Sequence, residues 1–266
     1  MPSEYWRRFL LVVAVAGMAA FMAAGCARER AHEEEGLDAG LAHMERAYRY
    51  MEFGELDKAM GDLVVAAKLM PDSSGPLLAL GDIYEAKGQF QQAVESYRSA
   101  LALDPNIAVA HFKIGFISKT MRGDNATALT RLSRAVELDS TNATYQFQLA
   151  DIFHETERFS EAKEHFEKAI SLNSDHAYAH YGLGEIMEAH MGLPEEGFSE
   201  FERAVSIAPR DANLRRLVGE AYARNGRPRE AVRHLLESLR LEPDSPRSEE
   251  VREMIRLIES SQGLIP

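Results

Sequence analysis

SGPLLALGDIYEAKGQFQQAVESYRSALALDPNI, residues Ser74–Ile107, predicts two short helices in succession. Apolar side chains recur at helical spacing in both halves, Gly88 separates the halves, and a proline ends the second. Small residues stand at Gly81, Ala93 and Ala100. Small side chains allow helix axes to approach closely, so the stretch indicates a helical hairpin. Neither helix can bury its apolar stripe alone, and the hairpin therefore needs neighbours.

The three small positions recur along the chain at a step of 34 residues, with two steps of 35. We interpret the longer steps as one-residue insertions near Gly123 and Leu193. The three columns are Ala47, Gly81, Gly115, Ala150, Gly184 and Gly219; Ala59, Ala93, Ala128, Ala162, Gly197 and Ala231; and Ala66, Ala100, Ala135, Ala169, Ala204 and Ser238. A fixed period of this length indicates a helical solenoid.

The pattern resembles a run of six tetratricopeptide repeats over residues 40–245. The family's aromatic position is filled by Tyr50, Tyr84, Phe153 and Tyr222, and its closing proline by Pro71, Pro105, Pro209 and Pro243. The sequence departs from the family at Ser118, Met187, Ser140 and Ser174. The resemblance implies an all-α, right-handed α-solenoid with repeats at about 40–73, 74–107, 108–142, 143–176, 177–211 and 212–245.

The segment 246–266 follows the last repeat. Its stretch Pro246–Ser260 is amphipathic and places its apolar residues on one helical face. Those residues are Val251, Met254, Ile255 and Ile258. We predict a C-terminal capping helix that covers the open end of the sixth repeat.

Residues 1–26 resemble a bacterial lipoprotein signal peptide. A short basic region precedes an apolar run from Phe9 to Ala24, and small residues lead to Cys26, which is the only cysteine. The resemblance implies cleavage before Cys26 and a lipid on its thiol, with acyl chains that hold the chain to a membrane. An uncleaved membrane anchor is the alternative. The pair Arg7-Arg8 also resembles a twin-arginine export signal, although an ordinary basic region is the simpler interpretation.

The residue after the cysteine is Ala27 rather than aspartate. In bacteria with two membranes, this resemblance implies sorting to the outer membrane, facing the periplasm. Residues 27–39 are charged and lack an apolar period, so they predict a short tether. The net charge of the whole chain is -12. Such a charge repels phosphate backbones and argues against a nucleic-acid partner.

In tetratricopeptide proteins the first helices line a concave groove, and the fifth, ninth and twelfth residues of each repeat point into it. Here the fifth column is apolar in five repeats and the ninth is acidic in four. We predict a protein-binding groove formed by Leu78, Asp82, Phe112, Phe116, Phe147, Asp151, Tyr181, Glu185, Arg216 and Glu220. It would accept a segment with apolar anchors and some positive charge. The alternative is that the aromatic residues pack between neighbouring helices.

The sequence offers no pattern for catalysis. His176 and His180 stand four residues apart, but His43, His111 and His180 share the fourth position of their repeats, which usually packs between the two helices. We therefore predict that these histidines have their hydrogen bonds satisfied within the fold and are not metal ligands. We predict no catalytic site, no metal and no cofactor. Neither a nucleophile elbow nor a phosphate loop after a strand occurs.

These features predict a membrane-anchored periplasmic scaffold that binds other envelope proteins. Its layout is similar to that of type IV pilus pilotins, of adaptors for peptidoglycan hydrolases and of outer-membrane assembly lipoproteins, so envelope or secretin and pilus assembly is the expected setting. The alternative is a glycan- or small-molecule-binding module of an exopolysaccharide export system. That module would focus polar and aromatic residues in one pocket.

Overall fold

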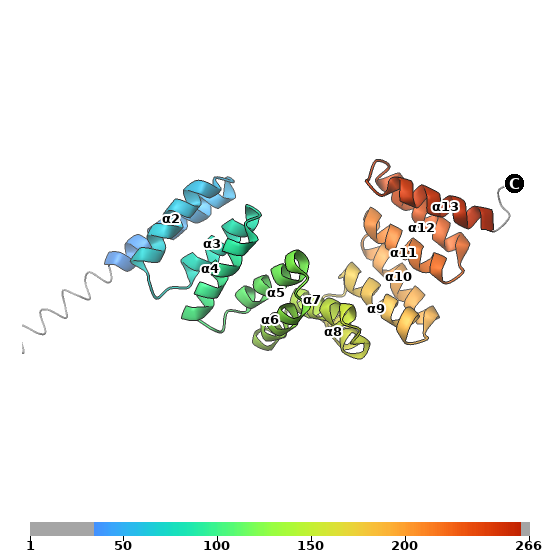
Figure 1. The fold of residues 1–266 in the computed structure, drawn as a ribbon, viewed down its shortest axis with the longest axis horizontal. Coiled ribbons are helices and arrows are strands. Elements are labelled where there is room, and N and C mark those ends of the chain that lie inside the picture. The colour runs from blue at the N-terminus through green and yellow to red at the C-terminus, as the bar shows by residue number, and fades with distance from the viewer. Residues whose placement is uncertain (1–34, 262–266) are drawn as a thin grey trace, which may run out of the picture. The chain divides into compact units, whose positions relative to one another are not determined.

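The computed structural model describes residues 35–261, in which every regular element is a helix (Figure 1). Residues 35–52 are helical. They are followed by α2 (Leu56–Leu69), α3 (Gly75–Ala86), α4 (Phe90–Leu103), α5 (Ala108–Arg122), α6 (Asn125–Leu138), α7 (Ala143–Glu155), α8 (Phe159–Leu172), α9 (Ala177–His190), α10 (Pro194–Ile207), α11 (Ala212–Arg224), α12 (Pro228–Leu241) and α13 (Ser248–Ser261). The prediction of an all-α chain of paired helices is confirmed.

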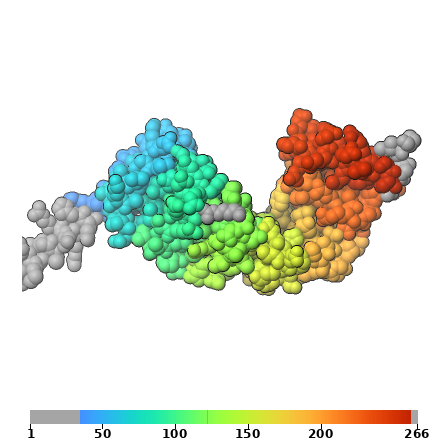
Figure 2. Space-filling view, viewed as in Figure 1, coloured from blue at the N-terminus to red at the C-terminus, as the bar shows by residue number. Residues whose placement is uncertain are grey.

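The chain divides into two compact units, Met1–Asn106 and Ile107–Pro266. In unit 1 the helix over 35–52 pairs with α2, and α3 pairs with α4. In unit 2 the pairs are α5/α6, α7/α8, α9/α10 and α11/α12, and α13 packs on α12. Within each unit the second helix of a pair contacts the first helix of the next pair. Segments of neighbouring colour in Figure 2 therefore lie side by side within each unit.

The small positions in the first helices face large side chains of the second helices. A Cβ atom added to Gly115 would lie 2.9 Å from Leu132, and one added to Gly219 would lie 2.8 Å from Leu235. Both leucines are fully buried. The glycines therefore allow the two helices of a repeat to approach until the larger residue fills the space between them.

The turn between the two helices of every repeat contains one residue in the left-handed region. Glycine occupies this place in five repeats, with φ between 61° and 73°, and Glu157 occupies it in the fourth, with φ 60°. A residue with a Cβ atom is strained at this φ, which explains the preference for glycine. One such turn residue is Gly123, which also ends α5 at the first predicted insertion.

A polar contact between the helices confirms both insertions. In five repeats the fourth residue meets a side chain on the second helix, in the pairs His43–Asp62, His111–Arg131, Gln146–His165, His180–Glu200 and Arg215–His234. The two residues are 19 apart in the first, fourth and sixth repeats and 20 apart in the third and fifth. The extra residue thus lies before the left-handed turn residue and lengthens the first helix, because α5 has 15 residues and α9 has 14, whereas α3, α7 and α11 have 12, 13 and 13. It leaves the helix pairing unchanged.

The C-terminal end of the described chain agrees with the prediction, and the N-terminal end differs from it. Val251 and Ile255 of α13 are buried against Leu235, which confirms the capping helix. Residues 35–39 are already helical, although the sequence assigned them to the tether. Gly40, the first residue of the predicted first repeat, is buried against Met70, whereas four of the five helical residues before it are exposed. The predicted signal peptide, Cys26 and the start of the tether lie outside the described residues.

Candidate functional site

The first helices of unit 2 form a continuous row in which α5 contacts α7, α7 contacts α9 and α9 contacts α11. Eight of the predicted groove residues belong to these helices: Phe112, Phe116, Phe147, Asp151, Tyr181, Glu185, Arg216 and Glu220. We call the surface that carries them the first-helix face. Leu78 and Asp82 belong to α3 in unit 1 and are treated separately.

Aromatic rings form the N-terminal part of the first-helix face. Phe112 is half-buried, and its ring stacks on Tyr145 of the next repeat with 4.8 Å between centroids. Phe116 lies one turn further along α5, with its ring centroid 6.1 Å from that of Phe112. Phe116 is also half-buried. Each ring therefore packs against the core and keeps part of its surface accessible to solvent.

Phe147 and Tyr181 continue this arrangement in the next two repeats. The Phe147 ring lies 4.5 Å from His176 and 5.8 Å from Phe166, measured between centroids. The Tyr181 ring lies 5.4 Å from Phe201, and its hydroxyl donates to Glu185 at 3.4 Å. Both residues are half-buried, and burial raises the pKa of Tyr181. The rings thus pack between helices and still reach the surface, and binding on this surface stays a prediction.

The acids of the first-helix face are paired with cations of the same face. The Lys119 ammonium binds Asp151 and lies 3.1 Å from Glu155, while its side chain is only 9% exposed. Arg224 lies 3.5 Å from Glu185. The expected attraction of a positively charged partner is therefore weaker than the acidic column suggested, since these charges are already compensated.

Arg216 marks a change of chemistry at the C-terminal end of the face. It stands in the fifth position, where the three preceding repeats carry aromatic rings, and it is nine-tenths buried. Its guanidinium donates to Glu220 and, at 2.8 Å, to Asn213. The face therefore changes from aromatic to cationic along α5, α7, α9 and α11.

In unit 1 the predicted acid Asp82 accepts a hydrogen bond from the buried Tyr97 hydroxyl at 2.7 Å. Glu85 Oε2 lies 2.9 Å from the same hydroxyl, so the two carboxylates share its one proton. Burial, followed by the interaction with Asp82, raises the pKa of Tyr97. Leu78 is half-buried. Asp82 therefore orients a core tyrosine as well as facing solvent.

Sequence reasoning missed the cations that neutralise this face. Lys119 is the twelfth residue of the third repeat, and it meets the ninth residue of the fourth, Asp151. The signal for this pair is an offset between two columns, a cation at the twelfth position of one repeat and an acid at the ninth position of the next. Arg224 stands just after the twelfth position of the sixth repeat and neutralises Glu185 of the fifth.

The histidines are held by hydrogen bonds inside the repeats. His180 is buried, with Nδ1 2.5 Å from Glu200 and Nε2 3.1 Å from the Ser174 carbonyl oxygen. His176 accepts a bond from the backbone N–H of Ala179 at 3.2 Å and so caps α9. Across residues 35–261 there is no cluster of three or more histidine, cysteine or acidic side chains suited to a metal ion. In the same part of the chain, no helix is long and apolar enough to span a bilayer.

Comparison with known proteins agrees with this architecture. The family described as TPR repeat, for tetratricopeptide repeat, matches residues 81–121 and 150–190. The helix pairs and their order are those of a solenoid of tetratricopeptide repeats. Among curated proteins it is similar to Lipopolysaccharide assembly protein B of Escherichia coli K12, with 26% identity over 182 residues, 68% of this chain and 43% of that protein. The chain spans less than half the length of the curated relatives it matches.

Solved structures of repeat proteins are similar as well. MamA protein shares 27% identity and a TM-score of 0.55, covering 68% of this chain and 97% of that one. The type IV pilus biogenesis factor PilW gives a higher TM-score of 0.69 at 17% identity, covering 80% and 97% of the two chains. At that identity PilW shows a likeness of fold only. Repeat solenoids of this kind present extended surfaces on which other proteins bind.

Proposed function

We propose that this protein is a lipid-anchored scaffold that binds polypeptide segments of other bacterial envelope proteins on the first-helix face. The observation that carries the proposal is the row of half-buried rings Phe112, Phe147 and Tyr181 on three helices that contact one another in order. Partly exposed aromatic anchors flanked by polar groups are the usual energetic centres of protein interfaces.

The distribution of these rings favours a polypeptide over a glycan. A compact sugar site would gather aromatic and polar groups around one cavity. Here the rings are spaced along α5, α7 and α9, one per repeat, and would contact successive residues of an extended or helical segment. The likeness to Lipopolysaccharide assembly protein B supports an assembly role in the envelope.

The membrane anchor in this proposal is the lipid on Cys26. The sequence supports it through the basic region, the apolar run and the single cysteine at the cleavage position. The tether after Cys26 is short, so the repeats would work close to the membrane surface. Together with Ala27, these features support the outer membrane, on its periplasmic side.

A photo-crosslinking experiment in cells tests the binding face. A benzoylphenylalanine placed at position 116 should yield specific crosslinked products, whereas the same group at Leu236, 52% exposed on the second helix α12, should not. Phe112→Leu with Phe147→Leu keeps apolar volume but removes both rings, so the products from position 116 should fall several-fold. Equal crosslinking from positions 116 and 236, with no effect of the double variant, would contradict the proposal.

A further inference from the structure

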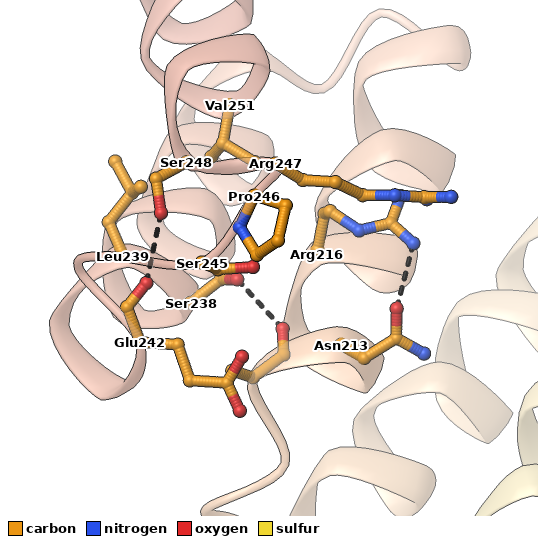
Figure 3. Close-up of a pocket in the computed structure, with 11 residues that line it drawn as sticks. Asn213, Arg216, Ser238, Leu239, Glu242, Ser245, Pro246, Arg247, Ser248 and Val251 are labelled. Atoms are coloured by element: carbon orange, nitrogen blue, oxygen red, sulfur yellow. Dashed lines mark hydrogen bonds between the residues drawn. The ribbon is translucent and has the colours of Figure 1, made fainter.

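The last repeat is covered by a helix, whereas the first repeat is open on its outer side. At the C-terminal end the Ser248 hydroxyl donates to the Glu242 carbonyl oxygen at 3.1 Å and holds α13 on α12 (Figure 3). At the N-terminal end one stripe of the helix over 35–52 is exposed to solvent among the described residues, and its Phe53 is 79% exposed. We call this stripe the N-terminal end surface, and its residues are Ala42, Arg46, Arg49 and Phe53.

The first three positions of this stripe are the third, seventh and tenth residues of the first repeat. In the other five repeats these positions are apolar or aromatic and buried. Their residues are Pro76, Ala110, Tyr145, Ala179 and Leu214; Leu80, Ile114, Leu149, Leu183 and Val218; and Ile83, Ile117, Ile152, Ile186 and Ala221. In unit 1, Leu80 and Ile83 share a core cluster with Leu63 of the preceding repeat. Two arginines at such positions mark an outer surface rather than a place for a further repeat.

The two arginines of the N-terminal end surface differ in their partners. Arg46 donates to Asp62 of α2 at 2.6 Å and 2.5 Å, so its charge is compensated inside the repeat. The exposed Arg49 guanidinium makes no ion pair or side-chain hydrogen bond with the residues that the structure describes. Arg49 stands one helical turn before Phe53, so the guanidinium and the ring share a side of the helix.

The charge of this surface is close to balanced, because Glu45 and Glu52 stand four residues before and three residues after Arg49. Net electrostatic attraction therefore does not decide what covers it. The surface instead combines one exposed aromatic ring with one guanidinium that can bind phosphate in a bidentate contact. Aromatic rings and arginines are the side chains that gather at the boundary between lipid headgroups and acyl chains.

The place of this surface in the chain is close to the proposed anchor. Eight residues, 27–34, separate Cys26 from the helix over 35–52. An extended chain covers roughly 3.3–3.6 Å per residue, so residue 35 lies within about 30 Å of the thiol. The helix itself is about 27 Å long and can lie along a bilayer on this tether. Met44, on another side of the same helix, lies against Gly75 of α3, so the N-terminal end surface faces away from the second repeat.

We propose that the N-terminal end surface rests on the lipid bilayer that holds Cys26, with the Phe53 ring among the headgroups and the Arg49 guanidinium on lipid phosphate. This docking rests on the lipid anchor of the proposed function. The bilayer takes the place that a preceding repeat occupies for the second repeat, so α3 and α4 lie on the side of unit 1 away from the membrane. The contact involves none of the residues of the first-helix face.

Photo-crosslinking to lipid tests this contact on the full chain, purified in detergent and reconstituted into vesicles of phosphatidylethanolamine with a minor share of phosphatidylglycerol. Only the vesicle phosphatidylethanolamine is radiolabelled, so acyl groups of the protein itself are not detected. Benzoylphenylalanine at position 53 should form several-fold more labelled adduct than the same group at position 99, which is exposed on α4 of the same unit. Arg49→Glu should lower the adduct at position 53 several-fold, and Arg98→Glu, which changes an exposed arginine of α4, should leave it unchanged.

Equal adducts at positions 53 and 99, or equal effects of the two arginine variants, would overturn the proposal. A crosslinked protein dimer from position 53 in place of the lipid adduct would show that a second copy covers this surface, and would overturn it as well. The anchor is measured separately, by the co-sedimentation of Cys26→Ser with the same vesicles. Co-sedimentation equal to that of the unsubstituted chain refutes the lipid on Cys26, whereas a chain that needs Cys26 to sediment but gives no adduct at position 53 refutes the docking alone.

Discussion

Two glycines in helix interiors should respond in opposite directions to the same substitution. Gly184 lies in α9, and a Cβ atom there would be 2.8 Å from the backbone oxygen of Gly197 and 2.9 Å from the Phe201 ring. Gly61 lies in α2, and no atom lies within 4 Å of the equivalent position. The pair separates the effect of helix propensity from the effect of close packing.

At Gly61, alanine adds helix propensity without a clash, so Gly61→Ala should stabilise α2 by about 0.5–1 kcal/mol. At Gly184 the same gain is offset by overpacking, which costs roughly 1–3 kcal/mol. The upper part of that range applies because the obstructing atom belongs to the backbone of α10 and cannot rotate away. Gly184→Ala should therefore destabilise the α9/α10 pair by about 1–2 kcal/mol net.

Amide hydrogen exchange followed by mass spectrometry measures both variants locally, which suits a chain with two units. Peptides from α9 and α10 should exchange about tenfold faster in Gly184→Ala, since about 1.4 kcal/mol corresponds to a factor of ten. Peptides from α2 should exchange more slowly in Gly61→Ala. Slower exchange in α9 and α10 of Gly184→Ala would refute the close approach of these helices, and with it the role assigned to the small positions.

Four further outcomes are expected. Ala162→Leu, at a fully buried small position, should cost about 1–3 kcal/mol or more in a urea titration, and a neutral result would place the repeat register in doubt. Glu157→Gly should stabilise the fourth repeat by about 0.5–1 kcal/mol because it relieves the left-handed backbone, whereas a loss of stability would mean that the turn differs. Burial lowers the pKa of His165 and His234, so the unfolded chain binds protons more readily than the folded chain. The stability contributed by these neutral histidines is present above about pH 6.5 and should be lost as the pH falls below that value, and the loss should be smaller in His165→Gln. A urea midpoint that does not change with pH would contradict this prediction. Cys26→Ser should move the protein from membranes to the soluble fraction, and retention in membranes would show that the anchor is not a lipid.

The repeat register could be predicted from sequence because it rests on single residues with strong physical demands. Small residues such as Gly115 recur where helices touch, and turns recur where only glycine is unstrained, so period and phase are both visible. The start of the first helix could not be predicted, because residues 35–39 are mostly exposed and carry no apolar period that would indicate a helix.

The candidate site could be predicted only in part. The fifth column places its rings on one side of the first helices, since the helical period fixes that side, and the structure shows these rings half-buried. That they bind a partner stays a prediction. The charge of the face could not be read from the acids alone. Lys119 of α5 binds Asp151 of α7. Such a contact depends on the spacing between two repeats rather than on positions within a single repeat.

These internal ion pairs decide which kind of contact can supply affinity. A lysine of a partner would have to displace Lys119 from Asp151, and this exchanges one ion pair for an equivalent one while adding the cost of desolvating the incoming ammonium. Affinity on the first-helix face should then come from the exposed parts of the aromatic rings. An apolar segment is therefore a better fit to this surface than the basic segment that the acidic column alone suggested.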